Sequence, residues 1–102
     1  MSELSFGKTI ARARKERKIN QRSLAEKVIK EDGKAITPQY LNDIEHDRRI
    51  PSPDVVSKFA EVLQIDPDYL EYLAGRIPQD WRKAELSEIQ FKEMAAAFRK
   101  SK

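Results

Sequence analysis

The sequence predicts an all-α protein, because apolar residues recur at helical spacing and no segment alternates like a half-buried strand. A second observation is a repeated helix-start signal, a capping side chain followed by proline, at Thr37-Pro38, Ser52-Pro53 and Asp66-Pro67. The cap oxygen accepts a hydrogen bond from an unpaired backbone N–H, and proline at the first helical position has no N–H to satisfy. We therefore expect five helices before residue 75 and a sixth after it.

The first helix is expected from about Leu4 to Arg17, and the second from the N-cap Asn20. Three more follow the Thr-Pro, Ser-Pro and Asp-Pro pairs, and Gly75 stands where a left-handed residue ends the fifth. The residues expected to face the core are Phe6, Ile10, Ala13, Leu24, Ala25, Val28, Leu41, Ile44, Val56, Phe59, Ala60, Leu63, Tyr69, Leu70, Tyr72 and Leu73.

The last part of the chain is predicted to be an extension, so we divide the sequence into a domain over 4–75 and an extension over 76–102. The stretch RIPQDWRKAE reads as a connector, and Ser87 with Gln90 matches a capping box that begins a helix. The apolar seam of this helix is Phe91, Met94, Ala95 and Phe98. The seam fits either packing on the chain's own core or an interface with a second copy or a protein partner, in which Trp81 would be an anchor.

Length and composition place the chain among small intracellular proteins. With 102 residues it fits one domain and an appendage, and the absence of cysteine suits a reducing cytoplasm. No stretch approaches the ~20 apolar residues of a membrane span, and the N-terminal residues do not resemble a signal peptide. We expect a cytoplasmic protein with no membrane contact.

Positive charge is concentrated in the first half of the chain. Residues 1–50 hold 12 Lys and Arg against 8 Asp and Glu, whereas residues 51–102 hold 8 against 9. Seven of the basic residues lie between Lys8 and Arg22, where Glu16 is the only acid. This asymmetry fits a surface that faces a polyanion, and taken alone it fits a hydrated helix face even better.

Catalytic and metal-binding signatures are absent from the sequence. It has no cysteine, no phosphate-binding glycine loop and no nucleophile elbow, and His46 is the only histidine. A metal site needs three or four ligands, so His46 beside Asp47 is read as a surface residue at a helix end. We expect neither an enzyme nor a cofactor nor a metal.

The linked stretches FGKTIARARKERKINQRSLAEKV and ITPQYLNDIEHDRRIPSPDVVSKFAEVLQIDPDYL point to one family. They resemble the lambda-repressor/Cro-type helix-turn-helix proteins, the XRE family, over about Phe6 to Leu73. The resemblance implies a five-helix lambda-repressor-like domain whose second and third helices form the DNA-binding unit, so that here a C-terminal helix is added. The chain departs from the pattern in one place: the turn before the third helix is lengthened by the segment IKEDGKA.

The resemblance makes the helix over 37–46 the one that reads the major groove of double-stranded DNA. Gln and Asn can pair with adenine, Asp can accept from the cytosine amino group, and Pro38 offers an apolar surface to a thymine methyl. The expected base contacts are Thr37, Pro38, Gln39, Asn42 and Asp43. Without the resemblance, the same pattern fits residues that merely face solvent equally well. The expected phosphate contacts are Gln21, Arg22, Lys34, Tyr40, Arg48 and Arg49, each of which alone fits an ordinary surface position.

The resemblance also implies an internal ion pair between Arg14 and Glu45, which ties the recognition helix to the first helix. On these grounds we expect a sequence-specific transcriptional regulator, of the repressor kind, that acts as a homodimer on DNA. The alternative is an antitoxin-like or adaptor protein whose C-terminal segment binds a protein partner.

Overall fold

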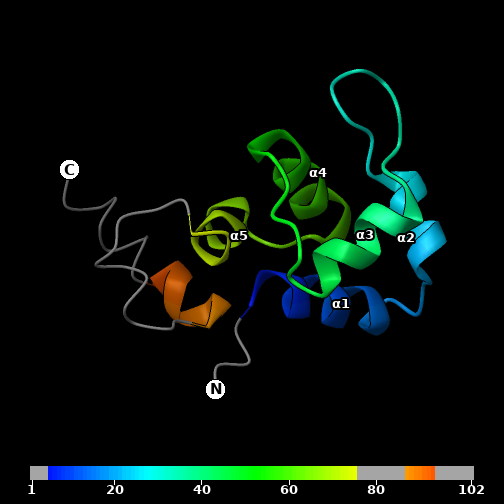
Figure 1. The fold of residues 1–102 in the computed structure, drawn as a ribbon. Coiled ribbons are helices and arrows are strands. Elements are labelled where there is room, and N and C mark those ends of the chain that lie inside the picture. Colours follow the sequence, from blue (N-terminus) through cyan, green and yellow to red (C-terminus); the bar gives the residue numbers. More distant parts are fainter. Residues whose placement is uncertain (1–4, 76–86, 94–102) are drawn as a thin grey trace.

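The computed structural model describes residues 5–75 and 87–93 of the chain. Its named helices are α1 (Phe6–Glu16), α2 (Gln21–Lys27), α3 (Pro38–Glu45), α4 (Pro53–Leu63) and α5 (Pro67–Leu73), and a further short helix covers 88–93. In Figure 1, α1 and α2 pack against α3, while α4 lies above α1 in this view and leads to α5. The expected all-α class is confirmed over the described residues.

The helix starts are the ones that the capping signals predict. The side chains of Asn20, Thr37 and Ser52 each accept a hydrogen bond from the backbone N–H three residues ahead. Asp66 accepts from the N–H groups of both Asp68 and Tyr69. Each such cap stabilises its helix by about 1 kcal/mol, so local sequence alone sets where these four helices begin.

The core lies between α1, α3, α4 and the inner face of α2, and it contains most of the residues that the helical spacing predicts. Tyr69 and Tyr72 lie instead in a second cluster, and Ala13 and Leu73 are only partly buried. Phe6 and Phe59 meet edge to face in its centre, with ring centroids 6.4 Å apart. Leu41 and Ile44 of α3 are fully buried there, as are Leu24 and Val28 of α2. The inner face of α3 is therefore committed to the core, and only its other face is open to a ligand.

An aromatic cluster attaches the 88–93 helix to α5. Phe91 is 1% exposed and packs against Tyr69 and Tyr72, with ring centroids 5.6 and 5.5 Å away. Burial, helped by the neighbouring Tyr72 and Glu88, raises the pKa of the Tyr69 hydroxyl. Ser87 and Gln90 form the predicted capping box, each side chain accepting from the other's backbone N–H.

Phe91 is one residue of the predicted C-terminal seam, and its ring is buried on the chain's own α5. A dimer or partner interface through the seam stays a prediction. Ile89 of the same helix is 72% exposed. Trp81, Met94, Ala95 and Phe98 lie outside the described residues.

The lengthened turn before α3 is a closed hairpin. Ile29 and Ala35 form an antiparallel bridge, and the N–H of Ile36 donates to the Val28 carbonyl. Gly33 turns the tip with a φ of 85°, a conformation that glycine adopts without strain. In Figure 1 this loop projects from the body of the molecule beside α2 and α3. The extra residues are therefore placed outside the core, and they rejoin it at Ile36, which is 4% exposed.

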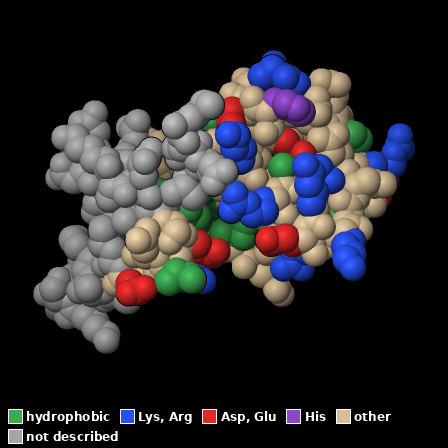
Figure 2. Space-filling model, turned by 90° about the horizontal axis from the view of Figure 1, so that it is seen from below, with side chains coloured by type: hydrophobic (Ala, Val, Ile, Leu, Met, Phe, Trp, Pro, Cys, Tyr) green, Lys and Arg blue, Asp and Glu red, His purple; other side chains and the backbone are tan. Residues whose placement is uncertain are grey.

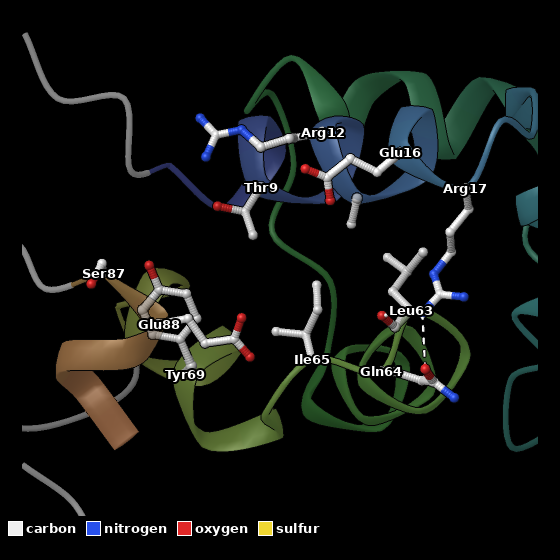
Figure 3. Close-up of a pocket in the computed structure, with 11 residues that line it drawn as sticks. Thr9, Arg12, Glu16, Arg17, Leu63, Gln64, Ile65, Tyr69, Ser87 and Glu88 are labelled. Atoms are coloured by element: carbon white, nitrogen blue, oxygen red, sulfur yellow. Dashed lines mark hydrogen bonds between the residues drawn. The ribbon is translucent and has the colours of Figure 1, made fainter. Parts of the chain in front are cut away.

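A hollow of about 480 Å³ lies between α1, the α4–α5 junction and the start of the 88–93 helix (Figure 3). Arg17 crosses its far end from α1 and donates to the Leu63 carbonyl and to the Gln64 side chain. These bonds supply a partner for the last turn of α4, where Gln64 adopts a left-handed conformation. The side chains that line the hollow carry charges of both signs, and Glu16 and Glu88 are the negative ones.

The start of α1 touches the end of α3 through a glycine. The N–H of Gly7 donates to Asp47 Oδ1 at 2.8 Å, and Asp47 itself is left-handed with a φ of 60°. A Cβ at Gly7 would lie 2.6 Å from the Glu45 carbonyl oxygen and closer still to that of Ile44. The backbones of two helices therefore meet at this point, and no side chain fits between them.

Gly7→Ala is expected to destabilise the protein by about 1–3 kcal/mol, because the added methyl forces α1 away from backbone atoms that cannot rotate aside. Urea unfolding of the variant measures the loss. Lys8→Ala, at the exposed neighbouring position, is the control and should change stability by less than about 0.5 kcal/mol. Equal stability of Gly7→Ala and the parent chain would contradict the close approach.

Candidate nucleic-acid interface

The outer face of α3 carries the residues that the sequence predicts to contact bases. Thr37, Pro38 and Gln39 are exposed at its beginning, and Asn42 and Asp43 are half-buried one turn later. Leu41 and Ile44, on the opposite face, are inaccessible to solvent. The helix is thus amphipathic, with a polar surface that begins at its N-terminal end.

A buried ion pair holds this helix against α1. Arg14 Nε lies 2.7 Å from Glu45 Oε2, and Arg14 Nη2 lies 3.1 Å from Oε1, so the contact is bidentate. The two side chains are only 12% and 4% exposed. A third bond runs from Arg14 Nη1 to the Ile19 carbonyl, which joins the turn between α1 and α2 to the same pair. The ion pair implied by the resemblance is present in the structure.

Gln21, predicted to contact a phosphate, has its side-chain amide engaged inside the protein. Its Nε2 donates to Glu45 Oε1 at 3.0 Å and to Asn42 Oδ1 at 3.1 Å. An amide nitrogen carries two hydrogens, so both are used, and the remaining side-chain oxygen is an acceptor that cannot bind a phosphate. A phosphate contact from this side chain would first have to break these bonds, and its observed role is to fasten α2 to α3.

Asp43, predicted to contact a base, is paired with Arg48, predicted to contact a phosphate. Arg48 places Nε and Nη2 each 3.0 Å from Asp43 Oδ1, and Gln39 Nε2 donates to the same oxygen at 3.3 Å. Arg48 therefore offsets the negative charge of Asp43. The cluster also gives the Gln39 amide a fixed orientation on an otherwise exposed helix turn.

The other predicted phosphate contacts lie around α3 in different surroundings. Arg22, Lys34 and Arg49 are exposed, on α2, on the hairpin and after α3 respectively. Tyr40 is half-buried and its ring packs on the core. His46 caps α3, and its Nδ1 donates to the Asn42 carbonyl. These three cations are therefore open to solvent, whereas Arg48 is paired with Asp43.

Sequence reasoning did not find the contacts of Gly7, Asp47 and Gln21. Gly7 and Asp47 are 40 positions apart, and their contact exists only once α1 and α3 have packed. A helical glycine costs about 1 kcal/mol relative to alanine, and Gly7 so close to a helix start is the one signal that could have suggested a close approach.

A family model described as "Helix-turn-helix" matches residues 10–70, which include the ion pair, all of α2 and α3, and most of the core. The chain belongs to this helix-turn-helix family. The match agrees with the lambda-repressor/Cro type that the sequence resembles, and it supports DNA binding rather than catalysis as the property of the domain.

One curated relative is "Multiprotein-bridging factor 1" of Candida glabrata, which is 36% identical over 63 residues. The match covers 62% of this chain and 38% of the relative, so the chain corresponds to well under half of that protein. No solved structure matches the chain. In the part of the chain that the structure describes, no helix is long and apolar enough to cross a membrane.

Glu45→Ala is expected to destabilise the fold by about 3–5 kcal/mol, because it leaves the Arg14 guanidinium buried without its counter-charge. Chemical denaturation of Glu45→Ala, Arg14→Ala and the double variant gives the coupling free energy between the two side chains.

Asp43→Ala, which removes the more exposed pair with Arg48, is the matched control and should cost less than about 1 kcal/mol. Additive losses in the Arg14 and Glu45 variants would show that the two side chains do not stabilise each other.

Proposed function

We propose that this chain is a sequence-specific transcriptional regulator, a repressor that occupies its operator as a homodimer and reads the major groove with α3. The observation that supports it best is the division of α3 between two faces. Glu45 is tied to Arg14 on the inner side, whereas Thr37, Pro38 and Gln39 are exposed on the outer side. A DNA-reading helix needs this combination of a rigid mounting and free polar side chains.

Gln39 is the residue to which we assign the main base contact. One hydrogen of its Nε2 is directed to Asp43, which leaves the second hydrogen and Oε1 free. Those two groups suffice for a bidentate contact with adenine, in which the amide donates to N7 and accepts from N6. The bond to Asp43 reduces the conformational entropy lost on binding, because the amide is already oriented.

Asn42 and Asp43 are less free to contact bases than Gln39. Asn42 Oδ1 accepts from Gln21, and Asp43 Oδ1 accepts from both Gln39 and Arg48. We propose that these residues act mainly by orienting their neighbours. The phosphate contacts would come from Arg22, Lys34 and Arg49, which are exposed on α2, on the hairpin and after α3. Such contacts position the protein on DNA and do not read its sequence.

Gln39→Ala is expected to cost about 1–3 kcal/mol of binding free energy on the preferred duplex and to relax the base preference at one position. The preferred duplex is first recovered by selection from a random pool with the full chain, and affinities are measured by mobility shift. Sizing of the same complex tests the homodimer. Selection that recovers no duplex bound more tightly than random DNA at moderate salt would end the proposal.

Arg49→Ala is expected to weaken binding to all duplexes alike and to reduce the slope of log K against log salt by about 1, because one phosphate contact is lost. Titrations at several salt concentrations, on the preferred and on random duplexes, measure both effects. An unchanged salt slope would remove Arg49 from the interface. Arg48→Ala is the comparison, since Arg48 already pairs with Asp43.

A second candidate function is protein bridging, in which the extension over 76–102 binds a protein partner, as in an antitoxin-like or adaptor protein. It is supported by the name of the relative, which describes a factor that bridges proteins, and by the exposed Ile89. Affinity capture with the full chain and with a chain ending at residue 75 separates the two candidates. A partner recovered equally well by both chains would argue against the extension as the binding segment.

A further inference from the structure

A groove runs between α1 and the carboxyl end of α3. It is lined by Lys8, Ala11, Arg12, Lys15 and Glu16 of α1 and by Glu45 and His46, and its volume is about 740 Å³. Lys8, Arg12 and Lys15 follow the spacing that places side chains on one side of a helix. Figure 2 views the molecule from this side, with blue Lys and Arg side chains gathered near the purple His46.

The cations of this groove are not neutralised by the protein itself. Within residues 5–75 and 87–93, Lys8, Arg12 and Lys15 are exposed and make no hydrogen bond or ion pair through their side chains. In Figure 3 the Arg12 guanidinium points away from Glu16 and from Glu88. The charge of Glu45 is taken up by Arg14, which leaves Glu16 as the one opposing charge among the lining residues.

The walls of the groove add hydrogen-bonding capacity and room. His46 uses Nδ1 on the Asn42 carbonyl, so Nε2 is the ring nitrogen available to an incoming group. Ala11 lies between the cations, and its short side chain fills little of the groove. Carboxylates aligned along an extended chain would meet a row of cations about one helical turn apart.

The size of the groove favours a peptide over a nucleic-acid duplex. Its volume of about 740 Å³ is that of a pocket which takes a few side chains. Of a B-form duplex, whose major groove alone is about 12 Å wide, only the phosphates of one strand could reach the cations of the groove. The groove also lies at the His46 end of α3, whereas the exposed base-reading residues begin at the Thr37 end.

From these observations we infer that the groove between α1 and the end of α3 binds an acidic peptide segment of a protein partner. Lys8, Arg12 and Lys15 pair with its carboxylates, and Nε2 of His46, an acceptor while Nδ1 donates to the Asn42 carbonyl, accepts a backbone N–H of the peptide from the opposite wall. The groove is separate from the Thr37 end of α3, whereas Arg49, a proposed phosphate contact, follows His46 by three residues, so the duplex arm below decides whether the partner and DNA bind together. The inference does not depend on the proposed base contacts.

The test uses the full chain and a fluorescein-labelled oligoglutamate peptide, with an oligoglutamine peptide of equal length as the uncharged control. Fluorescence polarisation is expected to show binding of the first peptide alone. Chemical-shift mapping with isotope-labelled protein is expected to place the largest changes at Lys8, Ala11, Arg12, Lys15 and His46. Largest changes on the outer face of α3 would overturn the inference, since the peptide would then only mimic DNA.

Arg12→Glu with Lys15→Glu is expected to weaken oligoglutamate binding by about tenfold or more, because two attractions become repulsions. Lys27→Glu with Lys58→Glu changes the net charge equally at positions outside the groove, and it should weaken binding far less. If the two double variants lose equal affinity for oligoglutamate, the net charge of the protein explains the binding and the inference is overturned. The milder Arg12→Gln with Lys15→Gln, checked by circular dichroism, should give an intermediate loss in a folded chain.

A duplex arm separates peptide binding from DNA binding. On the preferred duplex, or on random DNA if none is preferred, the groove variant should lose no more affinity than the Lys27 and Lys58 variant. A larger loss for the groove variant would make the groove part of the DNA interface and overturn the inference. If the chain binds no duplex while oligoglutamate binding remains specific, the proposed function as a DNA-binding regulator is wrong and the inference of a peptide-binding groove is kept.

Discussion

The buried ion pair between Arg14 and Glu45 is the contact on which the placement of α3 depends. Two charges that are almost fully removed from water are tolerated only when their hydrogen-bonding groups are satisfied, and here Ile19 and Gln21 supply the additional partners. The same atoms therefore join α1, the turn after it, α2 and α3. A shift of α3 along α1 would break the bidentate contact and leave a buried charge without its partner.

A second contact at the same end of α3 joins a backbone N–H of α1 to the Asp47 side chain. Asp47 accepts from Gly7 while the chain reverses through a left-handed residue, so the end of the helix lies directly on the start of α1. At the other end, Thr37 caps the helix and Ile36 is buried beneath it. Both ends of α3 are therefore fixed by contacts of their own. The added residues of the longer segment before α3 lie outside the core.

Much of the fold follows from local patterns, because a cap, a proline and an apolar stripe act within one or two helical turns. Asn20, Thr37, Ser52 and Asp66 begin helices for this reason, and the left-handed Gly75 ends one. The candidate site was only partly predictable. The amide of Gln21 and the pairing of Asp43 with Arg48 depend on which surfaces meet in space, and a list of polar residues cannot show which of them already have partners.

The tip of the hairpin before α3 is a position at which residues can be inserted at little cost in stability. Its two ends are hydrogen-bonded to each other at Ile29, Ala35 and Ile36, and its tip at Gly33 has open space around it. Doubling the length of a closed loop adds only about 0.6 kcal/mol of closure entropy. We therefore expect the tip to accept a spectroscopic label, an affinity tag or a new pair of termini with little strain passed to the helices that carry the site.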